Sequence, residues 1–188
     1  PRWLSGFMEL NAESKAIAAS QLAAELERFD DASLMQSLTY LQTLGDEYRL
    51  YSADPLAQML TRAHMRSLMG GSEISGIANL RTALEAGPTL LLSNHLAYCD
   101  TQIKDLLLAD NGADDLASKL IVVAGPKVYD HTFRRMASMG LNTLKTAQSA
   151  GLTHNESRMT PREIAAIALG TVRTAHTHMS TGSMVLVY

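Results

Sequence analysis

A histidine and an aspartate five residues apart form the pair of side chains best suited to chemistry. His95 and Asp100 follow the apolar run Thr89–Leu92 and stand at the start of a helical pattern over Thr101–Ala109. A turn of this length can bring the carboxylate back to the imidazole, where it would fix one tautomer and leave the other ring nitrogen as a general base. Such a base contributes about 10²–10⁴-fold in rate. On spacing alone, an aspartate that only caps a helix and a histidine that only bonds backbone explain the two residues at least as well.

The elements around this pair predict an α/β fold. Apolar runs too short for helices, bounded by polar or turn residues, indicate buried strands at Thr89–Leu92, Leu120–Ala124 and Met184–Tyr188. Between the last two runs, Thr160 and Glu163 form a capping-box pattern that starts a helix at Pro161. Alternating strands and helices predict a mixed or mostly parallel sheet flanked by helices. Ligand sites in such sheets lie at the carboxyl ends of the strands, which is where His95 stands.

The first part of the chain shows a different pattern, typical of a helical bundle. Leu22, Leu26 and Phe29 recur at helical spacing, and Asp54-Pro55 is a favourable start for a further helix. We therefore expect an N-terminal all-helical domain over residues 1–71 and an α/β core over residues 72–188.

Composition limits the classes of function. Sixteen basic and nineteen acidic residues give a net charge of −3 without a basic tract, which argues against binding of nucleic acid. One cysteine cannot form an internal disulfide or a multi-thiolate zinc site, and we expect no metal and no resident cofactor. Without an apolar run of about 18 residues, we expect a cytoplasmic protein whose N-terminal helices permit peripheral contact with a membrane. The chain opens at Pro1 and closes at Tyr188 within an apolar run, so we expect a piece of a longer polypeptide.

The sequence around the histidine resembles the glycerolipid acyltransferase superfamily. Ser93-Asn94-His95-x4-Asp100 after a leucine-rich run looks like the signature of that family. The similarity continues through Val122 to Lys127, and Ser138-Met139-Gly140-Leu141-Asn142 is similar to a stretch of soluble, plastid-type glycerol-3-phosphate acyltransferases. It covers roughly residues 72–188.

This resemblance implies a reaction. A fatty acyl group would pass from an acyl thioester, on coenzyme A or acyl carrier protein, to a hydroxyl of glycerol-3-phosphate in phospholipid biosynthesis. Carried over by position, His95 would be the general base and Asp100 the residue that holds its imidazole. No acyl-enzyme intermediate is implied, because a thioester is already reactive and one oriented base is sufficient.

A phosphate-bearing acceptor also needs cationic partners. Lys127 and Lys145 are the favoured candidates because each adjoins a strand end, and of the adjacent Arg134 and Arg135 at most one is expected to face the site. Asn94 is a further candidate for substrate contact. A solvated surface charge is the alternative for each cation.

Other functions stay open at this stage. The acceptor could be 1-acylglycerol-3-phosphate, or the chain could be a non-catalytic lipid-binding relative, since Leu141 stands where the family has arginine. A hydrolase that uses Cys99 with His95 is a third alternative. The His176-x-His178 pair is a poor metal site, because its members lie about 200° apart on a helix.

Overall fold

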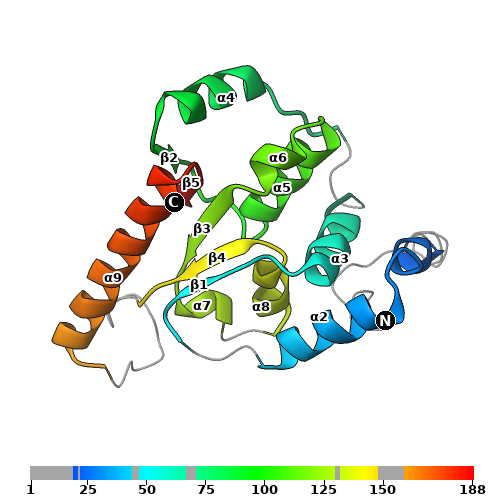
Figure 1. Ribbon diagram of the computed structural model, residues 1–188, viewed down its shortest axis with the longest axis horizontal. Helices are drawn as coiled ribbons and strands as arrows, with labels where there is room; N and C mark the ends of the chain where they lie inside the picture. The colour runs from blue at the N-terminus through cyan, green and yellow to red at the C-terminus, as the bar shows by residue number, and fades with distance from the viewer. Residues whose placement is uncertain (1–18, 21, 44–46, 67–70, 130–131, 148–158) are drawn as a thin grey trace.

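The computed structural model describes residues 19–20, 22–43, 47–66, 71–129, 132–147 and 159–188 (Figure 1). Within these ranges the chain forms a five-stranded sheet in the order β1-β4-β3-β5-β2. Strands β2, β3, β4 and β5 pair in parallel, and the short β1 pairs antiparallel with β4. The predicted α/β class with a mostly parallel sheet is therefore confirmed. The parallel strands bring their carboxyl ends to one edge of the sheet.

The strands and helices have the following bounds. The strands are β1 (Leu50–Tyr51), β2 (Thr89–Leu92), β3 (Leu120–Ala124), β4 (Asn142–Lys145) and β5 (Met184–Val187). The helices are α2 (Asp31–Thr43), α3 (Pro55–Arg66), α4 (Ile77–Ala86), α5 (Asp100–Asp110), α6 (Asp114–Ala117), α7 (Pro126–Tyr129), α8 (Thr132–Met139) and α9 (Pro161–Ser180).

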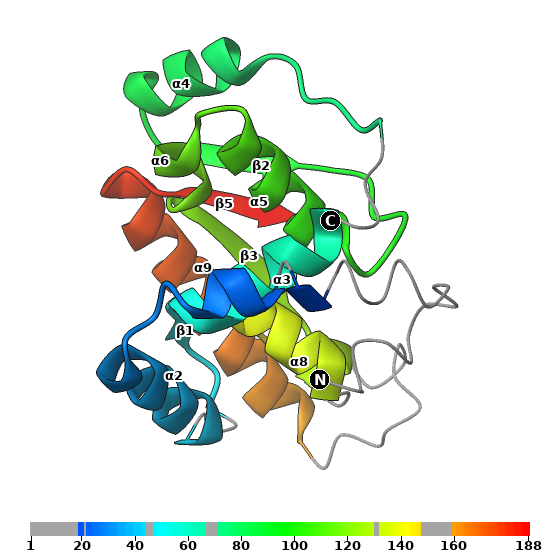
Figure 2. The same ribbon diagram turned by 90° about the vertical axis from the view of Figure 1, so that its right-hand side faces the viewer.

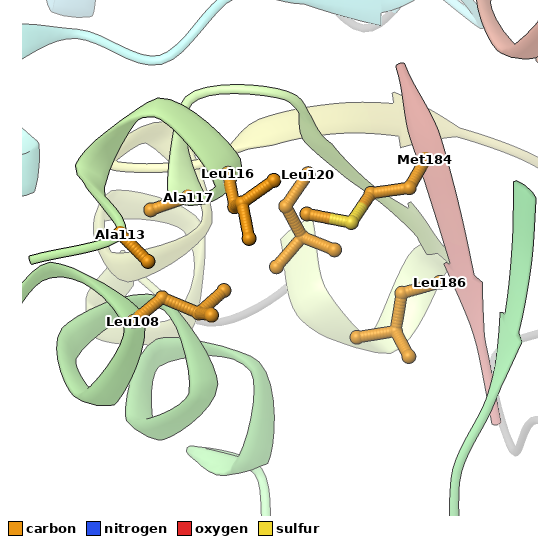
Figure 3. Packing of buried hydrophobic residues seen from close by; sticks show 7 residues of the cluster. All are labelled: Leu108, Ala113, Leu116, Ala117, Leu120, Met184 and Leu186. Atoms are coloured by element: carbon orange, nitrogen blue, oxygen red, sulfur yellow. The ribbon is translucent and has the colours of Figure 1, made fainter. Parts of the chain in front are cut away.

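Helices cover both faces of the sheet (Figures 1 and 2). On one face α4, α5 and α6 pack on β3 and β5 through a buried apolar cluster of Leu108, Ala113, Leu116, Ala117, Leu120, Met184 and Leu186, which Figure 3 shows from close by. On the other face Ala175 of α9 packs against Ile121, Leu144 and Val185. Because side chains alternate along a strand, β3 and β5 contribute to both clusters. Burial on both faces explains why β3 and β5 are short, continuous apolar runs. Strand β2 lies at the edge of the sheet and exposes Leu90 and Leu92, so the prediction that this strand is buried is wrong.

The structure does not confirm a separate all-helical domain at the N-terminus. Tyr51 of β1 pairs with Thr143 of β4, so this part of the chain adds a strand to the sheet. Arg62 of α3 binds Asp105 of α5 through two hydrogen bonds of 2.6 and 3.0 Å. The boundary placed at residue 71 stays a prediction, but α3 is docked on the α/β core.

Local signals set the helix starts as the sequence predicts. Thr160 and Glu163 form the complete capping box of α9, with both reciprocal side-chain bonds present. The Asp54 carboxylate accepts a 2.9 Å hydrogen bond from the Ala57 amide at the start of α3. These caps satisfy amides that a helix leaves without an internal partner.

The turn from α8 into β4 lies against α3 at very close range. A Cβ added at Gly140 would lie 2.9 Å from the Ala57 oxygen and from the Gln58 Cα and nitrogen, all of them backbone atoms. Only glycine fits this contact without a backbone shift. The turn thereby sets where α8 and the start of β4 can lie relative to α3.

Candidate active site

The loop after β2 holds a histidine against an aspartate, as the spacing predicts. Nδ1 of His95 lies 3.1 Å from Oδ2 of Asp100. The same carboxylate oxygen accepts hydrogen bonds from the amides of Leu96 and Ala97, at 2.6 and 3.0 Å. Asp100 is the first residue of α5, and its own amide donates to the Ala97 carbonyl at 3.1 Å. The backbone thus fixes the carboxylate, and the carboxylate in turn fixes the imidazole.

The electrostatics of the pair favour an ionised carboxylate. Partial burial acts to raise the pKa of Asp100, but the hydrogen bonds from Ala97, Leu96 and His95 and the positive charge of Lys104 outweigh it and hold the pKa below its usual value. An ionised Asp100 accepts a hydrogen bond from the N–H group at Nδ1. In the corresponding tautomer of the ring, Nε2 carries no proton. No hydrogen bond to Nε2 comes from the described part of the chain.

His95 lines an open cavity of about 1070 Å³ at the carboxyl ends of the parallel strands. The end of each parallel strand contributes to the wall. Residues 95–99 follow β2, Thr146 follows β4, and Val187 ends β5 with Tyr188 after it. Gly125, Lys127 and Val128 follow β3. The floor is apolar, with Val122, Ala137 and Leu141 buried beneath it. The cavity therefore combines a basic nitrogen with room for an apolar ligand.

Two of the predicted cations line this cavity. Lys127, in α7, lies exposed on its wall, and Arg134, in α8, lies on the wall with its guanidinium carbon 4.6 Å from the centre of the Tyr98 ring. Arg135 belongs to the lining of a second hollow, of about 510 Å³, so only one of the two adjacent arginines faces His95.

Two other predicted substrate contacts lie outside the cavity wall. Lys145 is buried, with Nζ 4.5 Å from the centre of the Tyr129 ring and 5.4 Å from that of Tyr48. Asn94 is exposed, and its backbone carbonyl accepts a bond from the Ser93 hydroxyl. The structure brings together His95, Asp100, Lys127 and Arg134, and it does not bring Lys145 or Asn94 to the same wall.

Sequence reasoning missed residues that the tertiary structure adds to the site. His64 and Met65, from α3, line the same cavity as residues 95–99, which come about thirty residues later in the sequence. Burial lowers the pKa of His64, which favours the neutral imidazole. No local pattern marks these residues, because only the docking of α3 on α5 through Arg62 and Asp105 brings them to the wall.

The remaining chemical candidates do not form a second centre. Cys99 is a free, half-buried thiol at the start of α5 that also lines the cavity, and none of the described hydrogen bonds or ion pairs gives it a base. Within the described ranges no three histidine, cysteine, aspartate or glutamate side chains cluster as metal ligands. None of the described helices has the length and apolar character needed to cross a bilayer.

The site can therefore accept a proton at Nε2 and bind an anion through Lys127 and Arg134 beside an apolar hollow. No protein-family model matches the chain, and a comparison with curated proteins finds no match. The chemistry of the site is accordingly inferred from its residues and their geometry.

Proposed function

We propose that this protein is an acyltransferase that moves a fatty acyl group from an acyl thioester, on coenzyme A or acyl carrier protein, to a hydroxyl of glycerol-3-phosphate. One observation carries the proposal. Asp100 accepts a hydrogen bond from Nδ1 of His95, which leaves Nε2 available in a cavity whose wall also contains Lys127 and Arg134. The sequence around the pair, Asn94-His95-x4-Asp100, resembles the acyltransferase signature and agrees with this geometry.

In the proposed reaction His95 acts first as a base and then as an acid. Nε2 takes the proton of the acceptor hydroxyl while the oxygen attacks the thioester carbonyl carbon, so that a C–O bond forms. The C–S bond of the tetrahedral intermediate then breaks, and the departing thiolate receives the proton from the imidazolium. Asp100 stays ionised throughout and stabilises the positive charge that develops on the ring.

The two cations support a phosphate-bearing acceptor. Lys127 supplies a compact positive charge, and Arg134 supplies a planar guanidinium whose orientation is set by the Tyr98 ring. Both lie on the wall of the cavity that contains His95. A phosphate bound there would hold its glycerol hydroxyls within the same cavity as Nε2, and the apolar floor would take the acyl chain.

The experiment is an acyl-transfer assay with His95→Ala in the full-length protein. We expect the variant to lose about 10²–10⁴-fold in kcat/KM with acyl-CoA and glycerol-3-phosphate. His176→Ala is the matched control, because His176 is exposed on α9 and outside the cavity wall. The proposal is rejected if His95→Ala keeps most of the activity. It is also rejected if the wild-type protein transfers no acyl group to glycerol-3-phosphate or to 1-acylglycerol-3-phosphate. A parallel assay with 1-acylglycerol-3-phosphate decides the acceptor, and binding of the thioester without turnover favours a non-catalytic lipid-binding protein.

We also propose that the protein works in the cytoplasm and touches a membrane peripherally at the cavity mouth. Leu96 and Tyr98 line the cavity and are exposed, Leu96 to 89%, and Leu92 at the end of β2 is exposed as well. Large apolar side chains next to Lys127 and Arg134 suit the interface of an anionic bilayer. In a sedimentation assay with vesicles of phosphatidylglycerol and phosphatidylcholine, Leu96→Asp should bind several-fold more weakly than wild type. Equal binding by the two proteins contradicts this contact.

A further inference from the structure

A tyrosine from the far end of the chain lies flat against the imidazole of His95. The ring centroids of Tyr188 and His95 are 4.3 Å apart, with 30° between the ring planes. Strand pairing brings the two residues together, since Val187 of β5 pairs with Leu92 of β2 and its carbonyl accepts a bond from the Ser93 amide at 3.2 Å. The loop that carries His95 therefore leaves the sheet beside Tyr188.

The tyrosine is itself held by the helix that carries Asp100. The Tyr188 hydroxyl lies 2.7 Å from the Thr101 hydroxyl and 3.4 Å from Nζ of Lys104, and that Nζ lies 5.0 Å from the centre of the ring. Burial raises the pKa of Tyr188, although the hydrogen bond with Thr101 acts in the opposite direction, so the hydroxyl stays protonated near neutral pH. Tyr188, which directly follows β5, thus contacts the first turn of α5 through its hydroxyl.

Asp100 holds the imidazole through one hydrogen bond. The side chain of His95 is 46% exposed, and Nδ1 lies 3.1 Å from Oδ2 of Asp100. When this bond opens, rotation about the Cα–Cβ and Cβ–Cγ bonds of His95 would swing Nε2 away from the cavity. A stacked aromatic contact opposes this rotation, because the imidazole must leave the face of the Tyr188 ring in order to turn.

The other aromatic neighbour cannot do the same. The Tyr98 ring meets His95 edge-on, with centroids 6.2 Å apart and planes at 90°, and it is exposed. It contacts the guanidinium of Arg134 instead. Of the aromatic contacts that the described residues make with His95, the one with Tyr188 is stacked.

We infer that Tyr188 is a positioning residue that sets the plane of the His95 imidazole and so aims Nε2 into the cavity. The inference rests on the proposed function for its catalytic consequence, while the stacking itself is a property of the folded protein. Thr101 and Lys104 hold the tyrosine through its hydroxyl, so the ring carries the effect and the hydroxyl supports it.

The test separates the ring from the hydroxyl. Tyr188→Phe keeps the stack and Tyr188→Leu removes it, and Leu169→Ala on the exposed side of α9 is the control outside the cavity. In the full-length protein we expect Tyr188→Leu to lower kcat about 10-fold with KM within two-fold, because a tilted base loses attack geometry but leaves the cations in place. Tyr188→Phe should stay within about three-fold of wild type.

A second readout needs no turnover. The Cε1 proton resonance of His95, assigned by its loss in His95→Ala, should lose its aromatic ring-current shift in Tyr188→Leu and keep it in Tyr188→Phe. An unchanged resonance in Tyr188→Leu overturns the inference, as does an equal loss of kcat in the Phe and Leu variants. If wild type shows no acyl transfer, the proposed function fails, while the resonance still decides whether the ring is held.

Discussion

Two carboxylates of α5, little more than one turn apart, serve different ends. Asp100 is the first residue of the helix, and its side chain is 13% exposed. Its carboxylate accepts hydrogen bonds from two backbone amides and from His95. Asp105 has a side chain that is 3% exposed, and the guanidinium of Arg62 binds both of its oxygens. Asp105 is buried and Asp100 is partly buried. Each contacts a nitrogen-bearing side chain, and the identity of that side chain separates the two aspartates.

The comparison shows how the partner determines the role. Arg62 stays charged at every accessible pH and binds Asp105 and Asp114 together, so this cluster holds α3 to α5 and α6 and has no proton to exchange. His95 is an imidazole, which can accept and release a proton, and its second nitrogen does not contact the carboxylate. The same helix therefore carries a structural ion pair on the side of α3 and, at the sheet edge, the pair to which we assign proton transfer.

The largest expected effect comes from replacing the carboxylate of the histidine pair. Asp100→Asn keeps the shape of the side chain but can present an amide nitrogen to Nδ1 and so favour the wrong tautomer of His95. We expect kcat to fall by about 10²–10⁴-fold, while the free energy of unfolding falls by only about 1 kcal/mol. Acyl-transfer kinetics and urea unfolding on the same preparation measure the two quantities. If Asp100→Asn had a near-normal kcat, Asp100 would have only a structural role, as Asp105 does.

The next effect is on stability. Asp105→Ala leaves the mostly buried Arg62 with Asp114 alone, and we expect the free energy of unfolding to fall by about 2–3 kcal/mol, measured by urea denaturation. Activity per folded molecule should stay near wild type if α3 remains docked. The double variant Arg62→Met with Asp105→Leu should lose less stability than Asp105→Ala, because no charge is left buried without its partner. A double variant as unstable as the single one would contradict this account.

The fold could be predicted from local patterns where those patterns decide the structure. The strands β2 and β3 have the predicted bounds, and α9 begins at Pro161 because its capping box is local in sequence. Strand β4 was not among the predicted strands, since Asn-Thr-Leu-Lys is half polar. Its polar groups are satisfied by tertiary contacts: the buried Thr143 hydroxyl donates to the Ser138 carbonyl, and Lys145 lies over the rings of Tyr129 and Tyr48.

The residues of the candidate site also divide into those that local sequence places together and those that only tertiary structure brings together. His95 and Asp100 meet within one loop, so spacing was enough to pair them. Tyr188 comes from a strand whose pairing with β2 is not encoded near either residue, and His64 depends on how α3 docks. The position of Lys145 also depends on tertiary packing, because a cation at a strand end can lie in the packed interior as well as in a cleft.

The depressed pKa of Asp100 predicts that the stability of the protein depends on pH. A carboxylate with a folded-state pKa below its unfolded value stabilises the protein above the unfolded pKa, near 4, and this contribution is lost as pH falls through the folded pKa. At pH 7 we expect Asp100→Asn to be about 1 kcal/mol less stable than wild type, the size of one or two net hydrogen bonds. The difference should shrink as the pH falls below about 4. Urea unfolding at pH 7, 5 and 3 measures it, and a constant difference would show that the ionised form is not favoured by folding.

The smallest effect concerns an ion pair with the geometry of Arg62–Asp105 but with access to solvent. Arg66 of α3 binds Asp110 of α5 through two hydrogen bonds of 2.6 and 3.2 Å, and the side chains are 49% and 40% exposed. Because water screens this pair and solvates either partner alone, Arg66→Gln should cost about 0.5 kcal/mol, and high salt should reduce even that. Urea unfolding at low and at high ionic strength tests it. A loss as large as that of Asp105→Ala would mean that the geometry of the pair, and not its burial, holds α3 against α5.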